Sequence, residues 1–164
     1  MTSAPLLTFW CDGVPTPPGS KKAFVVGKRA VIVDDNSATL KQWRAAVHDA
    51  ALRQIDRNRQ RGTEWDTITC AVEVHLVFWL PRPRSHYRTG KFSHLLRADA
   101  PARPGAKPDL DKLTRAIGDS LTSARVYQDD ALVVQSAQAK HYAERPEQSG
   151  VHVTVKPLPD EGTN

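Results

Sequence analysis

The hydrophobic positions between residues 37 and 59 recur at intervals of three and four, the spacing of one face of an α-helix. They are Leu40, Trp43, Val47, Ala50 and Ala51. The polar residues 34–37 offer N-cap side chains before this stripe, and Gly62 follows its basic, amide-rich end. The pattern therefore predicts a helix that ends at about Arg59.

A second helical stripe follows Pro108. Its apolar members are Leu110, Leu113, Ile117 and Leu121. Asp109 stands directly before the stripe, where its carboxylate can cap a helix N-terminus. The pattern predicts a shorter second helix with an acidic first turn.

Alternation of apolar and polar residues predicts the strands. The longest alternating run is 67–80, in which Glu73 and His75 face away from the apolar side chains. Those apolar side chains are Ile68, Cys70, Val72, Val74, Leu76, Phe78 and Leu80. The remaining apolar runs predict strands at 6–11, 125–127, 132–142 and 150–156, and a hairpin formed by 23–26 and 30–33.

Two segments are predicted to lack regular structure. Residues 81–107 carry prolines and few apolar side chains, which predicts a long loop, and 157–164 predicts a frayed tail. The predicted elements follow the order strand, hairpin, helix, strand, helix and strands, within one domain spanning residues 1–164. The expected fold is α/β or α+β, with a small mixed β-sheet and two main helices.

The positive charge of the chain is concentrated in the predicted loop. The formal net charge is +5, and the sequence pI is about 9.4. Residues 81–107 hold seven Lys and Arg side chains and one acidic residue, Asp99, so the rest of the chain is close to neutral. Such a segment is either a solvated loop without a partner or a surface for a polyanion. Its position directly before the acidic second helix favours the polyanion.

The two cysteines, Cys11 and Cys70, lie in strand-like runs without the spacing of a zinc site, so both are expected to be buried thiols. No apolar run reaches about 18 residues, so no transmembrane helix is expected. The N-terminus also lacks the basic and apolar regions of a secretion signal. The sequence therefore predicts a cytoplasmic protein in a reducing compartment.

The most informative segment is 107–115, Lys-Pro-Asp-Leu-Asp-Lys-Leu-Thr-Arg. On a helix, Asp111, Arg115 and Asp119 lie along one face, while Asp109 stands at the N-terminus, where the helix dipole favours negative charge. Asp-x-Asp alone is common in caps and turns. Here a second acidic pair at 129–130 and the neighbouring basic loop favour a divalent metal held beside nucleic-acid phosphate.

Three segments together resemble the RusA family of Holliday-junction resolvases, which are small endodeoxyribonucleases of bacteria, prophages and phages. The segments are Lys-Pro-Asp-Leu-Asp-Lys-Leu at 107–113, Asp-Ser-Leu at 119–121 and Val-Tyr-Gln-Asp-Asp-Ala at 126–131. The family pattern is Pro-Asp-x-Asp-Asn-Leu, a basic residue, Asp-Ala-Leu, and an aromatic residue followed by Asp-Asp. The Pro-Pro-Gly-Ser-Lys-Lys run at 17–22 is similar to the family's early basic turn, so the resemblance spans roughly residues 6–156.

The resemblance implies that Asp109, Asp111 and Asp130 are catalytic carboxylates that bind Mg²⁺, with Mn²⁺ as a substitute. The family has a catalytic lysine where this chain has Arg115. Arginine keeps the charge but does not exchange a proton near neutral pH, so an electrostatic role on the scissile phosphate is expected. Lys112 replaces the family's asparagine, and the retained Asp119 is expected to be structural.

The expected partner is branched DNA, bound at its phosphates without reading of the base sequence. The expected contacts are Lys21, Lys22, Arg82, Arg84, Arg88, Lys91, Arg97, Arg103, Lys107 and Lys112. A four-way junction has approximate two-fold symmetry, which suits a homodimer, and RusA-like proteins are dimeric. The resemblance thus implies junction resolution in DNA recombination and repair, inside a bacterial cell, by a protein of phage or prophage type.

Two alternatives fit the same residues. One is a metal-dependent nuclease that cuts flaps or other branched DNA without preferring junctions, and the other is a module that binds branched DNA without cutting it. A sugar-nucleotide transferase, which also uses Asp-x-Asp, fits the basic loop poorly. The sequence has no Gly-rich phosphate loop, His-Glu-x-x-His or Gly-x-Ser-x-Gly motif that favours another enzyme chemistry.

Overall fold

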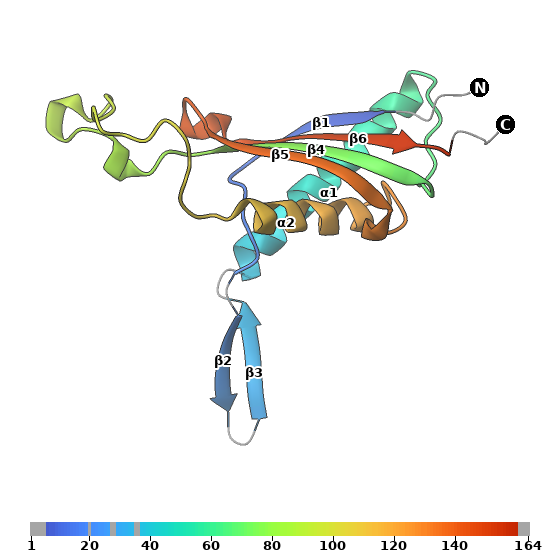
Figure 1. The fold of residues 1–164 in the computed structure, drawn as a ribbon, viewed down its shortest axis with the longest axis horizontal. Coiled ribbons are helices and arrows are strands. Elements are labelled where there is room, and N and C mark those ends of the chain that lie inside the picture. Colours follow the sequence, from blue (N-terminus) through green and yellow to red (C-terminus); the bar gives the residue numbers. More distant parts are fainter. Residues whose placement is uncertain (1–5, 20, 27–28, 35–36, 161–164) are drawn as a thin grey trace.

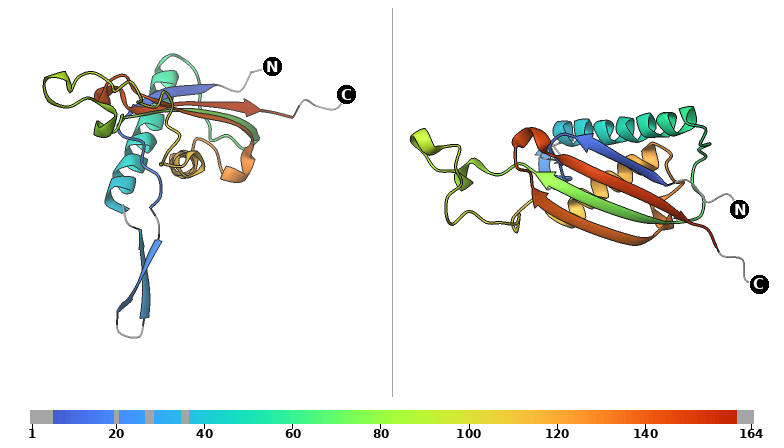
Figure 2. Two further views of the ribbon diagram at one scale, coloured as in Figure 1. Left: turned by 60° about the vertical axis from the view of Figure 1, so that its left-hand side comes forward. Right: turned by 90° about the horizontal axis from the view of Figure 1, so that it is seen from above.

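A four-stranded sheet forms one layer of the molecule, and two helices cover one of its faces (Figure 1, Figure 2). The computed structural model describes residues 6–19, 21–26, 29–34 and 37–160. The strand order is β1 (Leu7–Asp12), β6 (Gly150–Leu158), β4 (Ala71–Leu80) and β5 (Val133–Tyr142). The pairs β1–β6 and β6–β4 are antiparallel, whereas β4 and β5 are parallel. The chain therefore has the predicted α+β fold, a mixed sheet with two main helices.

The helices form where the apolar stripes lie. Helix α1 (Ser37–Gln60) ends before Gly62, which has a φ of 86° and donates its N–H to the carbonyl of Arg59 at 3.0 Å. Helix α2 (Leu110–Ser123) packs against α1 and β5. Every predicted stripe residue of α1 is buried, and so are those of α2 except Leu110, which is partly buried against the same core. Both predicted helices are confirmed.

Two predicted strands, 67–80 and 125–127, are shorter in the structure than the sequence predicts. Strand β4 begins at Ala71 and not at residue 67, and its register with β5 is irregular at Val72. Ile68 lies outside the strand and bonds instead to the segment after α2, through one bridge to Tyr127. The predicted strand at 125–127 reduces to that bridge, because Arg125 has a φ of 57° and turns the chain there.

The other predicted segments keep their places. Strands β2 (Lys21–Val26) and β3 (Arg29–Asp34) form the expected antiparallel hairpin, which extends from the helix side of the sheet (Figure 1). The loop 81–107 leaves one end of the sheet and contains two short 3₁₀ turns, Arg84–His86 and Gly90–Phe92. The predicted tail begins too early, since β6 pairs with β4 as far as Leu158; residues 161–164 lie outside the described residues.

The two cysteines differ in burial. Cys11 is buried in β1, and this burial, with a smaller contribution from the charge of Asp12, raises the pKa of its thiol to about 11. The thiol therefore stays protonated at neutral pH, as expected. Cys70 is only half-buried, because it lies at a bend before β4 rather than within the strand, so the prediction of burial is wrong there. In the part of the chain that the structure describes, neither helix has the length and apolarity needed to cross a bilayer.

Gly150 is required where strand β6 packs closely against strand β1. A methyl group on its Cα would overlap the carbonyl oxygen of Cys11 and the indole ring of Trp10, and the former belongs to backbone that cannot move aside cheaply. We expect Gly150→Ala to lower the free energy of unfolding by about 2 kcal/mol, in the range of overpacking mutations. Gly105→Ala is the control, because nothing lies within 4 Å of its added methyl. Equal denaturation midpoints for the two variants would contradict the expected overlap.

Candidate active site

The first acidic pair of the motif lies at the N-terminus of α2. Asp109 is the N-cap residue, and its carbonyl oxygen accepts the helical hydrogen bond of the Leu113 N–H at 3.1 Å. Its carboxylate does not cap the helix and lies 3.6 Å from the ammonium of Lys112. Asp111, in the first turn, is exposed. Both carboxylates therefore face solvent at the positive end of the helix dipole.

The early proline-rich turn lies beside this helix start. A hollow of about 320 Å³ is lined by residues of both segments: Pro17, Pro18, Gly19, Lys107, Pro108, Asp109 and Lys112. The two segments are thus neighbours in space although about 90 residues separate them in the chain. Lys21 and Lys22 continue from the turn into β2, and their side chains lie outside the described part of the structure.

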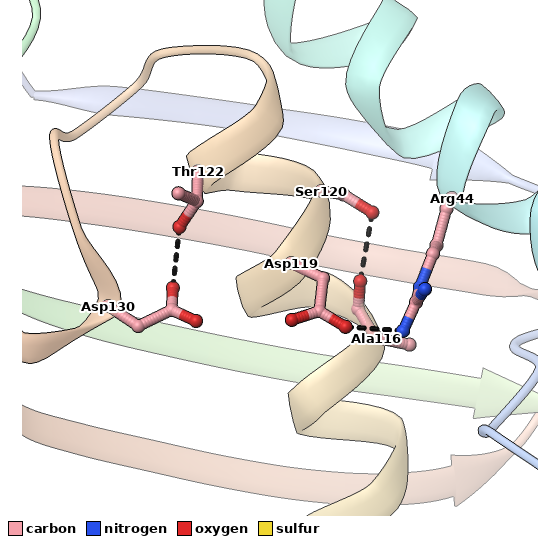
Figure 3. A network of polar contacts seen from close by, with 6 residues as sticks. All are labelled: Arg44, Ala116, Asp119, Ser120, Thr122 and Asp130. Atoms are coloured by element: carbon pink, nitrogen blue, oxygen red, sulfur yellow. Dashed lines mark hydrogen bonds and ion pairs between the residues drawn. The ribbon is translucent and has the colours of Figure 1, made fainter.

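The second acidic pair follows the turn at Arg125. The carboxylate of Asp129 accepts the N–H of Ala131 at 2.8 Å and so caps the short 3₁₀ helix Asp130–Leu132. The carboxylate of Asp130 points the other way, toward α2, and accepts the hydroxyl of Thr122 at 2.6 Å (Figure 3). Only Asp130 of this pair therefore turns toward α2.

Asp130 rests against α2 at Gly118, whose missing side chain leaves the space. A methyl group at Gly118 would lie 3.4 Å from a carboxylate oxygen of Asp130. Positions 111, 115, 118 and 122 fall on one stripe of the helix, so Arg115 lies between Asp111 and the point where Asp130 packs. Asp111 and Gly118 are seven residues apart, which is about 10 Å of helix.

The carboxylates are consequently spread along α2 rather than gathered around one point. Among the described residues, no three His, Cys, Asp or Glu side chains lie close enough together to hold a metal ion. Asp130 instead shares a groove of about 190 Å³ with Arg115, between α2 and the strands β4 and β5. The structure thus brings Arg115 together with Asp130, and Asp109 together with the basic turn.

Tyr127 also lines this groove, and its side chain is fully buried. Burial raises the pKa of its phenol, and the negative charge of Asp130 beside it raises that pKa further. The phenol is therefore protonated and neutral at any pH near 7. The sequence analysis assigned no role to Tyr127 or Thr122; the two lie beside Asp130 and help to fix its carboxylate.

Asp119 has a different environment from the other aspartates of α2. It forms an ion pair with Arg44 of α1 (Figure 3). Both side chains are partly exposed, at 37% for Arg44 and 40% for Asp119. The pair joins α2 to α1, whereas Asp130 contacts α2 at Thr122 and Gly118, so the surroundings of Asp119 suit the expected structural role.

Replacing Asp119 tests that assignment. We expect Asp119→Asn to lower the free energy of unfolding by no more than about 1 kcal/mol, since the pair is partly solvated. In a gel assay of the DNA cleavage that the resemblance implies, under conditions where the fold is intact, the variant should cut within about two-fold of the rate of the unchanged chain. Loss of cleavage without loss of stability would place Asp119 in the reaction instead.

The basic loop surrounds a hollow of its own. This hollow has a volume of about 750 Å³, and its lining includes four of the expected DNA contacts, Arg82, Arg84, Arg88 and Arg97. The loop itself projects from one end of the sheet (Figure 1). A concave surface lined by guanidinium groups suits the phosphates of a DNA strand.

Some of these arginines already have partners. Arg82 donates to the carbonyl of Pro101 at 2.7 Å and lies over the ring of Tyr142, 4.4 Å from its centroid. Arg97 makes two hydrogen bonds to Asp99, which lowers the pKa of that carboxyl. The side chain of Arg84 makes no hydrogen bond or ion pair within the described residues, so its charge is the least compensated in the hollow.

The remaining basic residues of the loop and its end lie outside this hollow. They are Lys91, Arg103 and Lys107. Lys91 lies over the ring of Phe92, and Lys107 lines the hollow at the start of α2 together with Lys112. Six of the expected basic contacts therefore line two hollows, one in the loop and one at Asp109, whereas Lys91 and Arg103 line neither.

One basic residue near the motif was missed by the sequence analysis. Lys140 of β5 donates to the carbonyl oxygens of Ala106 and Pro108 at 2.8 and 2.9 Å. These carbonyls flank the Lys107–Pro108 peptide bond, which is cis, directly before Asp109. Nothing near Lys140 in the sequence indicates this contact, because its partners are 34 and 32 residues away.

A comparison of the sequence with known protein families gives a match over most of the chain. The family model described as endodeoxyribonuclease RusA matches residues 12–156, which is most of the chain. The match begins at the last residue of β1 and includes both helices, the acidic pairs and the basic loop. A comparison with curated proteins gives no match.

Proposed function

Because the chain belongs to the RusA family of endodeoxyribonucleases, we propose that it resolves four-way DNA junctions by paired, metal-dependent hydrolysis of phosphodiester bonds. The observation that carries the proposal is the acidic helix start at the end of the basic loop, where Asp109 shares a hollow with Lys107 and Lys112. Asp109 and Asp111 face solvent at the N-terminus of α2, where the loop 81–107 arrives. Negative groups bordered by cationic surfaces suit a bound cation beside bound phosphates.

The proposed cofactor is Mg²⁺, with Mn²⁺ as a substitute, since both take oxygen ligands. Mg²⁺ is usually held by one or two carboxylates together with phosphate oxygens. The exposed pair Asp109 and Asp111 fits that donor set with a DNA phosphate as the further ligand. When bound, the ion would activate water and stabilise charge on the phosphate.

Arg115 and Asp130 complete the proposed catalytic set. Arg115 is exposed on the same stripe of α2 as Asp111, one turn further along the helix. Its guanidinium can neutralise a phosphate oxygen with two parallel hydrogen bonds, which suits an electrostatic role. Asp130 is the third carboxylate that the family resemblance implies. It accepts a hydrogen bond from Thr122 and lines the same groove as Arg115, so we keep it in the proposed catalytic set.

DNA would be held by its backbone. The proposed contacts are Lys21, Lys22, Arg82, Arg84, Arg88, Lys91, Arg97, Arg103, Lys107 and Lys112. Contacts of this kind position DNA and carry no sequence information, so recognition would depend on the branched shape. A homodimer would place one site on each of two opposed strands of a four-way junction. Paired cuts of that kind serve recombination and repair, which is the role we propose in a bacterial cell, as a phage or prophage enzyme.

The test is a gel assay with synthetic DNA labelled on each strand. The substrates are a four-way junction, a flap and a linear duplex of the same sequence, each with Mg²⁺ and with EDTA. Paired nicks on opposed strands of the junction, absent in EDTA, are the expected result. Equal cutting of the flap would favour a general nuclease for branched DNA, and binding without any nick would favour a module that only binds.

A further inference from the structure

The side chain of Lys140 holds the segment before Asp109 to the sheet. Lys140 reaches from the end of edge strand β5 to two carbonyl oxygens, those of Ala106 and Pro108. The two bonds bracket residue 107 and end one residue before Asp109. Apart from them, Gly105 bonds only within the loop, to Arg103, and the next backbone bond is the first of α2. Lys140 therefore links the sheet to the start of the acidic motif through hydrogen bonds.

The ammonium of Lys140 lies at the entry to α2. A helix N-terminus carries a partial positive charge, so a lysine held beside it is disfavoured by the dipole. The carbonyls of residues 106 and 108 compensate two of the three N–H donors of Lys140. The third donor has no partner within the described residues, and Asp109 and Asp111 stand on the adjacent helix start. Two carbonyl oxygens therefore hold the ammonium at the entry to the acidic motif, with one donor left over.

We propose that Lys140 is a positioning residue of the active site. By fixing the carbonyls on both sides of residue 107, it sets the direction in which the chain enters α2 and hence the place of Asp109 and Asp111. The inference rests on the proposed nuclease function. Misplacement of a reacting group by about 1 Å can cost about 100-fold in rate, so the loss of this tie should reduce turnover rather than binding.

The test compares Lys140→Met, which keeps the side-chain length but removes the donors, with Lys140→Arg, which keeps charge and donors. Lys156→Met is the matched control. Lys156 is exposed on β6, and its ammonium lies 3.9 Å from a carboxylate oxygen of Glu73, a long ion pair. Single-turnover cleavage of the junction in Mg²⁺, junction affinity in EDTA, and hydrogen exchange of the backbone amides would be measured. The denaturation midpoint shows that each variant is folded.

Lys140→Met should cut the junction about 10- to 100-fold more slowly, with affinity within about two-fold of wild type. Exchange should rise at residues 105–113 and stay unchanged in α1, and Lys140→Arg should regain most of the rate. Wild-type cleavage by Lys140→Met, or a loss of rate that parallels a loss of affinity, would overturn the proposal. If the wild type itself does not cut DNA, the nuclease proposal fails, while the exchange at 105–113 still decides whether Lys140 fixes this segment.

Discussion

Asp111→Asn is expected to reduce cleavage of a four-way junction by at least about 100-fold, since changing even the partners of metal ligands typically costs 10- to 100-fold. The side chain keeps its size and one oxygen but loses the charge that attracts a divalent cation. Affinity for the junction in EDTA should be unchanged or slightly higher, because a negative charge near the phosphates is removed. Rate and affinity are separated by single-turnover cleavage in Mg²⁺ and gel-shift titration in EDTA.

The matched control is Asp56→Asn, the same substitution at an exposed position on α1. Within the described residues, Asp56 forms an ion pair with Arg59, three residues further along α1. The control should cut at the wild-type rate. Asp111→Asn should also unfold at nearly the wild-type midpoint, because the carboxylate contributes only about 0.3 to 1 kcal/mol through the helix dipole. Cleavage by Asp111→Asn within about three-fold of the wild type would remove Asp111 from the proposed metal site.

The helices could be predicted from the sequence because each has a stripe that repeats over several turns. Trp43 and Val47 in α1 and Leu113 and Ile117 in α2 are buried where the period places them. Strand ends were harder to predict, since alternation continues through residues 67–70 although the chain bends at Cys70. Ile68 is buried as the pattern predicts, yet its partner is Tyr127 and not a neighbouring strand, which no local pattern indicates.

The site shows the same division between local and distant causes. The place of Asp109 and Asp111 follows from a cap residue and the first turn of a helix, and both are visible in the sequence. The place of Asp130 depends on the turn at Arg125, a residue with positive φ that is not glycine. Asp119 shares a helix face with Asp111 in the sequence pattern, but Arg44 from another helix fixes its role.

The three catalytic carboxylates implied by the family resemblance therefore rest on different supports. Asp109 and Asp111 belong to one rigid helix start, whereas Asp130 is placed by a hydrogen bond to Thr122 and by space at Gly118. Arg115 lies between the two groups. A phosphate bound to a cation at the acidic helix start would also lie near Arg115, whose guanidinium can give it two parallel hydrogen bonds, in keeping with the proposed electrostatic role.

The double substitution Arg84→Gln with Arg88→Gln is expected to weaken junction binding about 10- to 100-fold near physiological salt. Both side chains line the loop hollow, and neither forms an ion pair within the described residues, so their charge is available for phosphates. If each contacts one phosphate, the slope of log affinity against log salt should fall by about 2. The measurement is a gel-shift or fluorescence titration in EDTA at several salt concentrations.

The control for this pair is Arg57→Gln with Arg61→Gln, which removes the same charge at the far end of α1, away from the loop (Figure 1). Both residues are exposed, and the control should change the slope by much less than the loop variant. Equal slopes for the two double variants would mean that net charge, and not the loop hollow, determines affinity. A smaller slope for the loop variant alone would assign its phosphate contacts to residues 84 and 88, because short-range contacts release counterions whereas distant charges are screened.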